Sequence, residues 1–417
     1  AAPRVRARVL ADLRGESREL TGLVNEVLAL AGGQGANGEP EPVPLATVAE
    51  SVATRARRRT ERQITVDADA SQILAPRAAV ERAVWNLVDN AAKYARGSTP
   101  AEVELPPGTY QLTAVARDGS TLTTAVAIHR GERTTLDLTP PPPGTVPPGF
   151  VFVPAGEVEF GAAASDEAAR SFFLTAPMHP RHVDAFVIAT TEVTIAEWLR
   201  FVEAQPPARQ AALVPRAEAA LGTSGALALT RTDQGWQLTL QPADVALQAG
   251  WGEPLVYPGR TTLARQDWRR FPVTAISATD AEAYAAWLAA TGQVPGARLC
   301  TELEWTRAAR GADGRSYPTG PTIDVTDANF DATHGHERMG PDEIGSHPKS
   351  VSVFGVHDLV GNAYEWARTA TGDGYVALGG SYFHDRLTAH LANRNLAVPS
   401  LRDAVVGMRV CATPRRG

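Results

Sequence analysis

The chain has 417 residues, a formal net charge of −6, 44% hydrophobic and 21% charged residues, and two cysteines. The negative charge gives no general attraction to nucleic acid, and two cysteines exclude both a disulfide-rich scaffold and a four-cysteine zinc site. The sequence contains no run of about 18 apolar residues, so it predicts no membrane-spanning segment.

The first hundred residues are predicted to be mainly helical. Between residues 5 and 32, apolar residues recur at three- and four-residue steps, which indicates an amphipathic helix. After a Gly-rich linker, we expect a helix near Leu45–Arg58, a strand near Gln63–Asp67 and a helix near Ala75–Tyr94. The start of the chain holds no signal-peptide core, which by default predicts a cytoplasmic location.

A stripe of polar side chains lies on the predicted helix before Tyr94. Asn86 and Asn90 are four residues apart and share a face, and Lys93 continues the stripe. These groups suit a magnesium-bound triphosphate, although a plain amphipathic helix would explain the amides alone. The string ERAVWNLVDNAAKYA resembles the N-box of the histidine-kinase ATPase domain. The resemblance covers about residues 1–103 and implies that Asn86 or Asn90 holds magnesium, while Lys93 and Tyr94 touch the nucleotide.

Two parts of a working histidine kinase are missing from this region. No histidine precedes His129, and the glycine boxes that should follow Tyr94 are replaced by strand-like sequence. We therefore expect no ATP binding. We interpret residues 1–33 as the end of a dimerisation hairpin and residues 34–100 as a partial ATPase domain. A gene fusion and a join made during sequence assembly would both give this pattern.

Residues 101–140 change to a strand-like pattern. Thr and Val alternate with polar residues, and PPG, RDGS and HRGE mark turns, which predicts a small antiparallel β module. The string LPPGTYQLTAVARDG resembles the PEGA-type modules of bacterial surface and kinase proteins. The Pro-rich stretch at 141–149 is predicted to be an extended linker and the clearest domain boundary.

The remaining residues, 150–417, alternate turns and short strands with two predicted helices, Ile195–Ala204 and Thr279–Ala290. Thr194 and Glu197 predict a capping box at the start of the first helix. Residues 205–265 form a less regular insertion that holds the hairpin-like string WQLTLQPADVAL.

Seven strings in this region resemble, in order, motifs of the formylglycine-generating enzyme (sulfatase-modifying factor) family. They include PPGFVFVPAGEVEFGA at 147–162, ARLCTELEWTRAARGADGRSYPTG at 297–320, FGVHDLVGNAYEWA at 354–367, LGGSYF at 378–383 and GMRVCA at 407–412. The resemblance covers residues 147–412. It implies an irregular α+β fold related to C-type lectins, here preceded by the all-β module and the kinase remnant.

The resemblance also implies a structural calcium site in the string DLVGNAYE. Two carboxylates and two carbonyls of a tight turn are the hard oxygen donors that calcium prefers, and the matching positions are Asp358, Gly361, Ala363 and Glu365. The alternative is that both carboxylates are solvated. A second calcium string would begin at Asn329 and Phe330, but the sequence after it departs from the family pattern in length.

The cysteine pair of the family's oxidases is absent. Those enzymes use two thiols after Gly-Gly-Ser-Tyr to bind Cu(I), which prefers soft ligands. Here His384 occupies the first position, the second falls near Thr388 or Ala389, and no cysteine lies between Cys300 and Cys411. We therefore expect no copper-dependent oxidation. Whether Cys300 and Cys411 form a bridge or two separate buried thiols is left open.

His384, Asp385 and His390 are candidates for a substitute metal site. Two histidines and a carboxylate can hold iron, but the family's non-haem iron relatives take their histidines from a separate helical domain whose string this chain lacks. We favour isolated side chains over a site there, and likewise for His334 and His336 in a Gly-rich loop.

These features predict a catalytically degenerate domain of the formylglycine-generating enzyme type. Its expected role is a ligand-binding or sensory module of a bacterial signalling protein, with calcium as a structural ion and no redox metal. The partner would be an unidentified peptide, glycan or small ligand, and nucleic acid is not expected. The alternatives are a non-haem metal-dependent oxidase or sulfatase-modifying-type enzyme, and a histidine-kinase-derived signalling protein.

Overall fold

The computed structural model of the chain describes residues 41–59, 72–75, 81, 85, 108–116, 119–131, 134–136, 138–173, 175–218 and 225–414. The contacts divide the chain into one unit of residues 1–108 and 128–139 and a second unit of residues 109–127 and 140–417. Several predictions lie outside the described residues: the helix of residues 5–32, the strand near Gln63–Asp67, and the polar side chains of Asn86, Asn90, Lys93 and Tyr94.

The first unit contains a helix where the sequence predicts one. Strands β1 (Glu41–Pro44) and β2 (Gln72–Ala75) pair antiparallel, and α2 (Leu45–Arg59) follows β1 directly. Val48, Val52 and Ala56 are buried on α2 at four-residue steps, so they lie along one face of the helix.

A β-hairpin opens the second unit. It consists of β3 (Gly108–Val115) and β4 (Thr121–Ile128), which lie within the predicted β module. Ala125 belongs to a hydrophobic cluster that also contains Trp305 and Phe330, and Gln111 donates a hydrogen bond to the carbonyl of Val353. Residues 109–127 therefore share a core with the region after the linker.

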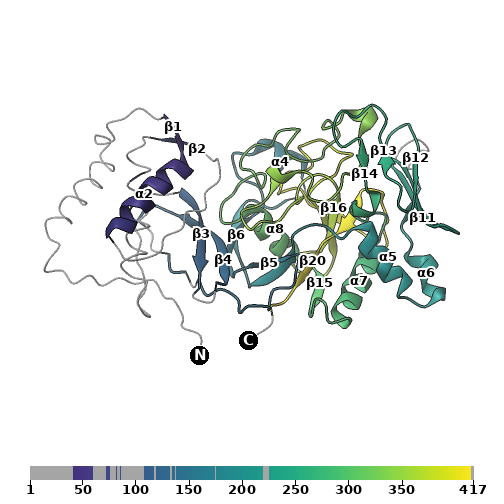
Figure 1. Cartoon of the computed structure of the whole chain (residues 1–417), viewed down its shortest axis with the longest axis horizontal. Helices are drawn as coiled ribbons and strands as arrows, with labels where there is room; N and C mark the ends of the chain where they lie inside the picture. The colour runs from purple at the N-terminus through teal and green to yellow at the C-terminus, as the bar shows by residue number, and fades with distance from the viewer. Residues whose placement is uncertain are drawn as a thin grey trace. The chain divides into compact units, whose positions relative to one another are not determined.

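The rest of the second unit is a mixed α/β fold with short elements (Figure 1). One sheet has the order β15-β20-β8-β5 and another the order β18-β17-β16-β19, in which β16 and β19 are parallel. The bounds in these sheets are β5 Phe150–Val153, β8 Phe186–Ala189, β15 Ala297–Leu299, β20 Val410–Ala412, β16 Tyr364–Arg368, β17 Tyr375–Leu378, β18 Asn395–Ala397 and β19 Val406–Met408.

The insertion at 205–265 forms an antiparallel sheet of its own, in the order β12-β11-β10-β9. Its strands β11 and β12 are the hairpin that the sequence predicts. Two further antiparallel pairs, β6–β7 and β13–β14, complete the strands. The bounds are β9 Arg216–Ala217, β10 Ala226–Thr232, β11 Gly235–Gln241, β12 Leu247–Gly250, β6 Gly156–Phe160, β7 His179–Val183, β13 Leu255–Val256 and β14 Arg265–Gln266.

Both predicted helices of the second unit are present, and three further helices were missed. The predicted ones are α5 (Ile195–Glu203) and α7 (Ala278–Ala290). The others are α4 (Glu167–Phe172), α6 (Pro207–Leu213) and α8 (Glu302–Arg310), and short 3-10 helices lie at Trp268–Arg270, His336–Arg338 and Pro348–Ser350. In Figure 1, α5 lies between α6 and α7, and α7 lies beside β15, whereas α8 lies beside β6.

Capping boxes begin the main helices of the second unit. The predicted box at Thr194 and Glu197 is present, and matching boxes start α7 at Ser277 and α8 at Thr301. Each satisfies amide groups that the first helical turn leaves without partners. Within the core, Trp198 of α5 stacks on Tyr284 of α7 with ring centroids 5.4 Å apart, so aromatic packing joins the two helices.

No described helix is both long and apolar enough to cross a membrane. Cys300 and Cys411 form a disulfide, which settles the alternative that the sequence left open. The two cysteines are 111 residues apart, their Cα atoms are 4.8 Å apart, and both are buried.

We expect removal of this disulfide to destabilise the second unit. Closing a loop of this length restricts the unfolded chain, so replacing both cysteines with alanine should cost about 2–5 kcal/mol of the free energy of unfolding. Thermal melts of the wild-type chain and of the Cys300→Ala/Cys411→Ala variant would measure the difference. Detection of two free thiols in the unreduced, denatured wild-type chain would contradict the bridge.

Candidate functional site

The string predicted to bind calcium forms a buried turn that leads into β16. Asp358 is 2% exposed and has a φ of 55°. Gly361 has a φ of 76°, and a Cβ at that position would lie 2.5 Å from the backbone oxygen of Asn329, so a larger residue does not fit. This close approach packs the turn against Asn329. The fold therefore brings the two predicted calcium strings together.

Glu365, the last residue of this string, is engaged by other side chains. Arg409 Nε lies 3.0 Å from both carboxylate oxygens, Arg409 Nη2 lies 2.6 Å from Oε1, and Trp305 Nε1 donates to Oε2 at 2.8 Å. A carboxylate has about four lone-pair sites, and three N–H donors already contact these two oxygens. Glu365 is therefore engaged by Arg409 and Trp305, and calcium stays a prediction from the resemblance.

A further carboxyl group, which the sequence analysis missed, shares this buried space. Glu192 is 2% exposed, and its Oε2 lies 3.8 Å from Arg409 Nη2. Burial raises the pKa of Glu192 well above its usual value, and the nearby Asp358 carboxylate adds to the rise. Burial also raises the pKa of Asp358, although the Gly345 amide donates a hydrogen bond to it. Arg409 is thus the cation around which these carboxyl groups gather.

Asn362 links this cluster to the second predicted calcium string. Its Oδ1 accepts hydrogen bonds from Asn329 Nδ2 at 3.1 Å and from the Asp342 amide at 2.9 Å. Phe330 is fully buried in the hydrophobic core. In the described structure, the buried Oδ1 of Asn329 has no hydrogen-bond partner, so it remains an acceptor for a water or an ion.

Asp342 is the centre of a second buried network that sequence reasoning missed. Its Oδ1 accepts from Arg260 Nη1 at 2.7 Å and Gln266 Nε2 at 2.8 Å. Its Oδ2 lies 2.9 Å from Nε2 of both His334 and His347. Burial opposes ionisation of Asp342, but the hydrogen bonds from the two histidines and the charge of Arg260 outweigh it and lower the pKa of this carboxyl far below its usual value.

His384 occupies the loop where the family's oxidases carry their cysteines. Its Nδ1 lies 2.8 Å from Ser381 Oγ, and its ring meets the Tyr364 ring edge to face at 5.3 Å. Burial lowers the pKa of His384, which favours the neutral imidazole at pH 7. The neighbouring Asp385 accepts a hydrogen bond from the Thr388 amide and so shapes the turn.

His390 points to a different partner. Its Nδ1 accepts a hydrogen bond from the Ala392 amide at 2.9 Å, so the proton is on Nε2, which donates to Asp166 Oδ2 at 2.7 Å. Both ring nitrogens are therefore in use, and burial lowers the pKa of His390. The structure does not bring His390 and His384 together as ligands of one ion.

The remaining histidines give no metal site either. His334 binds Asp342, whereas the side chain of His336 is 74% exposed and its Nδ1 lies 3.3 Å from Asp331. Within the described ranges, no group of three or more His, Cys, Asp or Glu side chains is arranged to hold a metal ion.

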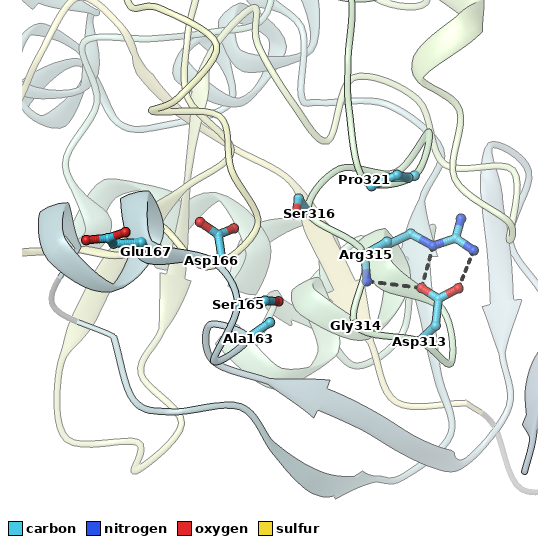
Figure 2. A pocket seen from close by; sticks show the side chains of 10 residues that line it. Ala163, Ser165, Asp166, Glu167, Asp313, Gly314, Arg315, Ser316 and Pro321 are labelled. Carbon is cyan, nitrogen blue, oxygen red and sulfur yellow. Dashed lines mark hydrogen bonds and ion pairs between the residues drawn. The ribbon is translucent and has the colours of Figure 1, made fainter.

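An open depression of about 710 Å³ is lined in part by Asp166, the hydrogen-bond partner of His390 (Figure 2). Ala163, Ser165, Asp166 and Glu167 form one side, and the loop from Asp313 to Pro321 faces them. Asp313 and Arg315 pair with each other through two short contacts of 2.7 and 2.8 Å. Because its charged groups are largely paired already, the depression suits a polar, uncharged ligand better than an ion.

A family model for the sulfatase-modifying factor enzyme 1-like domain matches residues 135–414. An inactive Cα-formylglycine-generating enzyme 2 from Bos taurus is 36% identical over 106 residues, which cover 23% of this chain and 32% of that protein. A serine/threonine-protein kinase from Chlamydia trachomatis is 31% identical over 137 residues, or 33% of this chain and 19% of the kinase.

Hercynine oxygenase from Mycobacterium tuberculosis is 30% identical over 216 residues, which cover 49% of this chain and 42% of that enzyme. The chain therefore spans less than half the length of the first curated relatives that it matches.

We expect Asp342→Asn to destabilise the second unit by about 3–5 kcal/mol, because it leaves Arg260 as an uncompensated buried charge. The side-chain amide nitrogen of the new asparagine would also face an N–H group, because both oxygens of Asp342 accept hydrogen bonds in the wild type. Since the folded pKa of Asp342 is lowered far below the unfolded value of about 3.9, its contribution is fully present above that value and is lost progressively as the pH falls from there through the folded pKa. Denaturant unfolding at pH 7 and about pH 2.5 would measure both effects.

Asp244→Asn is the matched control, since Asp244 is exposed. If the difference in the free energy of unfolding between wild type and Asp342→Asn does not decrease at the lower pH, the ionised state of Asp342 is contradicted.

Proposed function

Because the chain belongs to the sulfatase-modifying factor family, we propose that its second unit is a ligand-binding module that has lost the family's copper-dependent oxidation. One observation carries this proposal. Both cysteines of the chain are tied together in the Cys300–Cys411 disulfide, so no free thiol remains. Cu(I) prefers soft thiolate ligands, and the loop offers His384 and either Thr388 or Ala389 in their place. The name of the inactive relative from Bos taurus is consistent with such a loss.

A sensory role in a signalling protein is the second part of the proposal. The similarity to a segment of a serine/threonine-protein kinase supports it, because that protein joins a similar region to a signalling enzyme. The depression between residues 163–167 and 313–321 is the binding site that we favour, for a peptide, a glycan or another small polar ligand. The buried disulfide supports folding in an oxidising compartment rather than the cytoplasm expected by default.

The alternative is a metal-dependent oxygenase, which the similarity to hercynine oxygenase favours. Against it, His390 uses both ring nitrogens in contacts within the chain, so His384 lacks a second histidine ligand.

Metal analysis and an oxidation assay on the intact chain separate the two functions. We expect neither copper nor iron near one per chain, and no aldehyde on a peptide carrying a sulfatase cysteine, because no thiol is free. Stoichiometric iron or copper that is lost in His384→Ala, or any aldehyde product, would overturn the proposal. Calcium near one per chain would support the separate calcium prediction, and its absence would refute that prediction alone.

A thermal-shift screen of peptides and glycans tests the binding role. A ligand that binds the folded state raises Tm, by an amount that grows with its concentration relative to Kd. We expect Ser165→Trp, which would fill the depression, to abolish the shift given by a ligand found in this way. Ser171→Trp is the control, because Ser171 is exposed on the same segment but does not line the depression. A shift that survives Ser165→Trp would place the ligand elsewhere.

A further inference from the structure

The segment of residues 161–173, which includes α4, packs on a small hydrophobic cluster. Among its described side chains, the buried apolar ones, Ala162 and Ala169, form this cluster with Ala392, and Phe173 packs against it. By contrast, Trp305, Ala308 and Ala309 of α8 lie in a large core cluster. Three alanine methyl groups and one partly buried ring contribute less burial free energy than the large cluster, so the described side chains of this segment give it less hydrophobic anchoring than α8 has.

Among the described side chains, Asp166 joins this segment to the loop of residues 386–393 through a hydrogen bond with His390. Asp166 uses one carboxylate oxygen to cap α4 by accepting from the Ala169 amide at 2.9 Å. Its other oxygen accepts from His390 Nε2 at 2.7 Å. The His390 ring is held in turn by the Ala392 amide and by the nearby rings of Phe173 and Tyr317. Asp166 therefore caps α4 and joins it to the loop of residues 386–393.

The segment contacts the loop of residues 386–393 through His390 and Ala392. His390 directly follows Ala389, near the second position where the family's oxidases carry a cysteine. On its other side, the segment forms one wall of the depression in Figure 2. Movement of residues 161–173 would therefore change the shape of the depression and uncover the loop of residues 386–393 at the same time.

We propose that residues 161–173 are a strap that opens without unfolding the rest of the unit, and that the contact between Asp166 and His390 is the latch that holds it closed. The proposal does not depend on the identity of any ligand. It differs from ordinary loop mobility because one named contact controls the opening.

Hydrogen exchange measured by mass spectrometry on the intact chain tests the strap. In the wild type, we expect amides of residues 163–173 to exchange on the order of 100-fold faster than those of α8, because the strap opens locally. Asp166→Asn should speed exchange in the strap by about tenfold or more. Asparagine still caps a helix, but its amide then faces the His390 N–H and the latch is lost. Exchange of α8 should not change.

Glu167→Gln is the matched control, because Glu167 is the exposed neighbour of Asp166 and takes no part in the latch. Equal protection of the strap and α8 in the wild type would show that the strap is part of the common core, and would overturn the proposal. The same holds if Asp166→Asn speeds exchange equally in both elements. A strap that exchanges fast but does not respond to Asp166→Asn would refute the latch.

Discussion

The buried ion pair between Arg409 and Glu365 is the interaction on which the second unit depends most. Arg409 is the single residue between β19 and β20, which belong to different sheets. Its guanidinium binds Glu365 on β16 and donates to the carbonyls of Ala189 at the end of β8 and His357 in the turn before β16. Trp305 of α8 donates to the same carboxylate. Two sheets and a helix therefore meet at one charge pair, and removal of either partner would leave the other charged and buried.

A buried network of polar side chains extends from this ion pair into the rest of the unit. Glu192 and Asp358 add carboxyl groups to a space that holds one guanidinium, and Asn362 carries the network on to Asp342. Asp342 then joins Arg260 from the insertion to two histidines from the loop after Asn329. Chains of hydrogen bonds in a low-dielectric interior strengthen one another, but they cost free energy wherever a member lacks a partner. Side-chain networks of this kind hold irregular loops in place, because such loops have few of the backbone hydrogen bonds that helices and sheets provide.

Local sequence patterns predicted the elements whose signals are local, and they failed where partners are far apart. The helix at Leu45–Arg59, helices α5 and α7 and the β11–β12 hairpin follow from periodicity, capping residues and turns. Helix α8 was missed because its buried face includes Arg307 and Arg310, which no apolar period reveals. Arg260 and Asp342 are 82 residues apart, and Glu192 and Asn362 are 170 apart. Nothing in the local sequence indicates that these residues are partners. Asp358 and Glu365 were found only because a family string marks them, and that string does not show the guanidinium beside Glu365.

The loop after Gly379, where the family's oxidases carry two cysteines, keeps its shape largely through contacts of backbone atoms. The His384 carbonyl accepts a hydrogen bond from the Asp331 amide, and the Leu391 amide donates to the Ser316 carbonyl. Gly380 is packed so closely that a Cβ there would lie 2.8 Å from Ala389 Cα. The first two contacts use backbone atoms, so they do not depend on the side chain at position 384, which itself contacts Ser381 and Tyr364. Position 389 is restricted to a small residue, because Ala389 is fully buried and its Cβ would lie 2.9 Å from a Cβ at Gly380. A fold maintained in this way can outlast its original chemistry and present the same loops to a ligand.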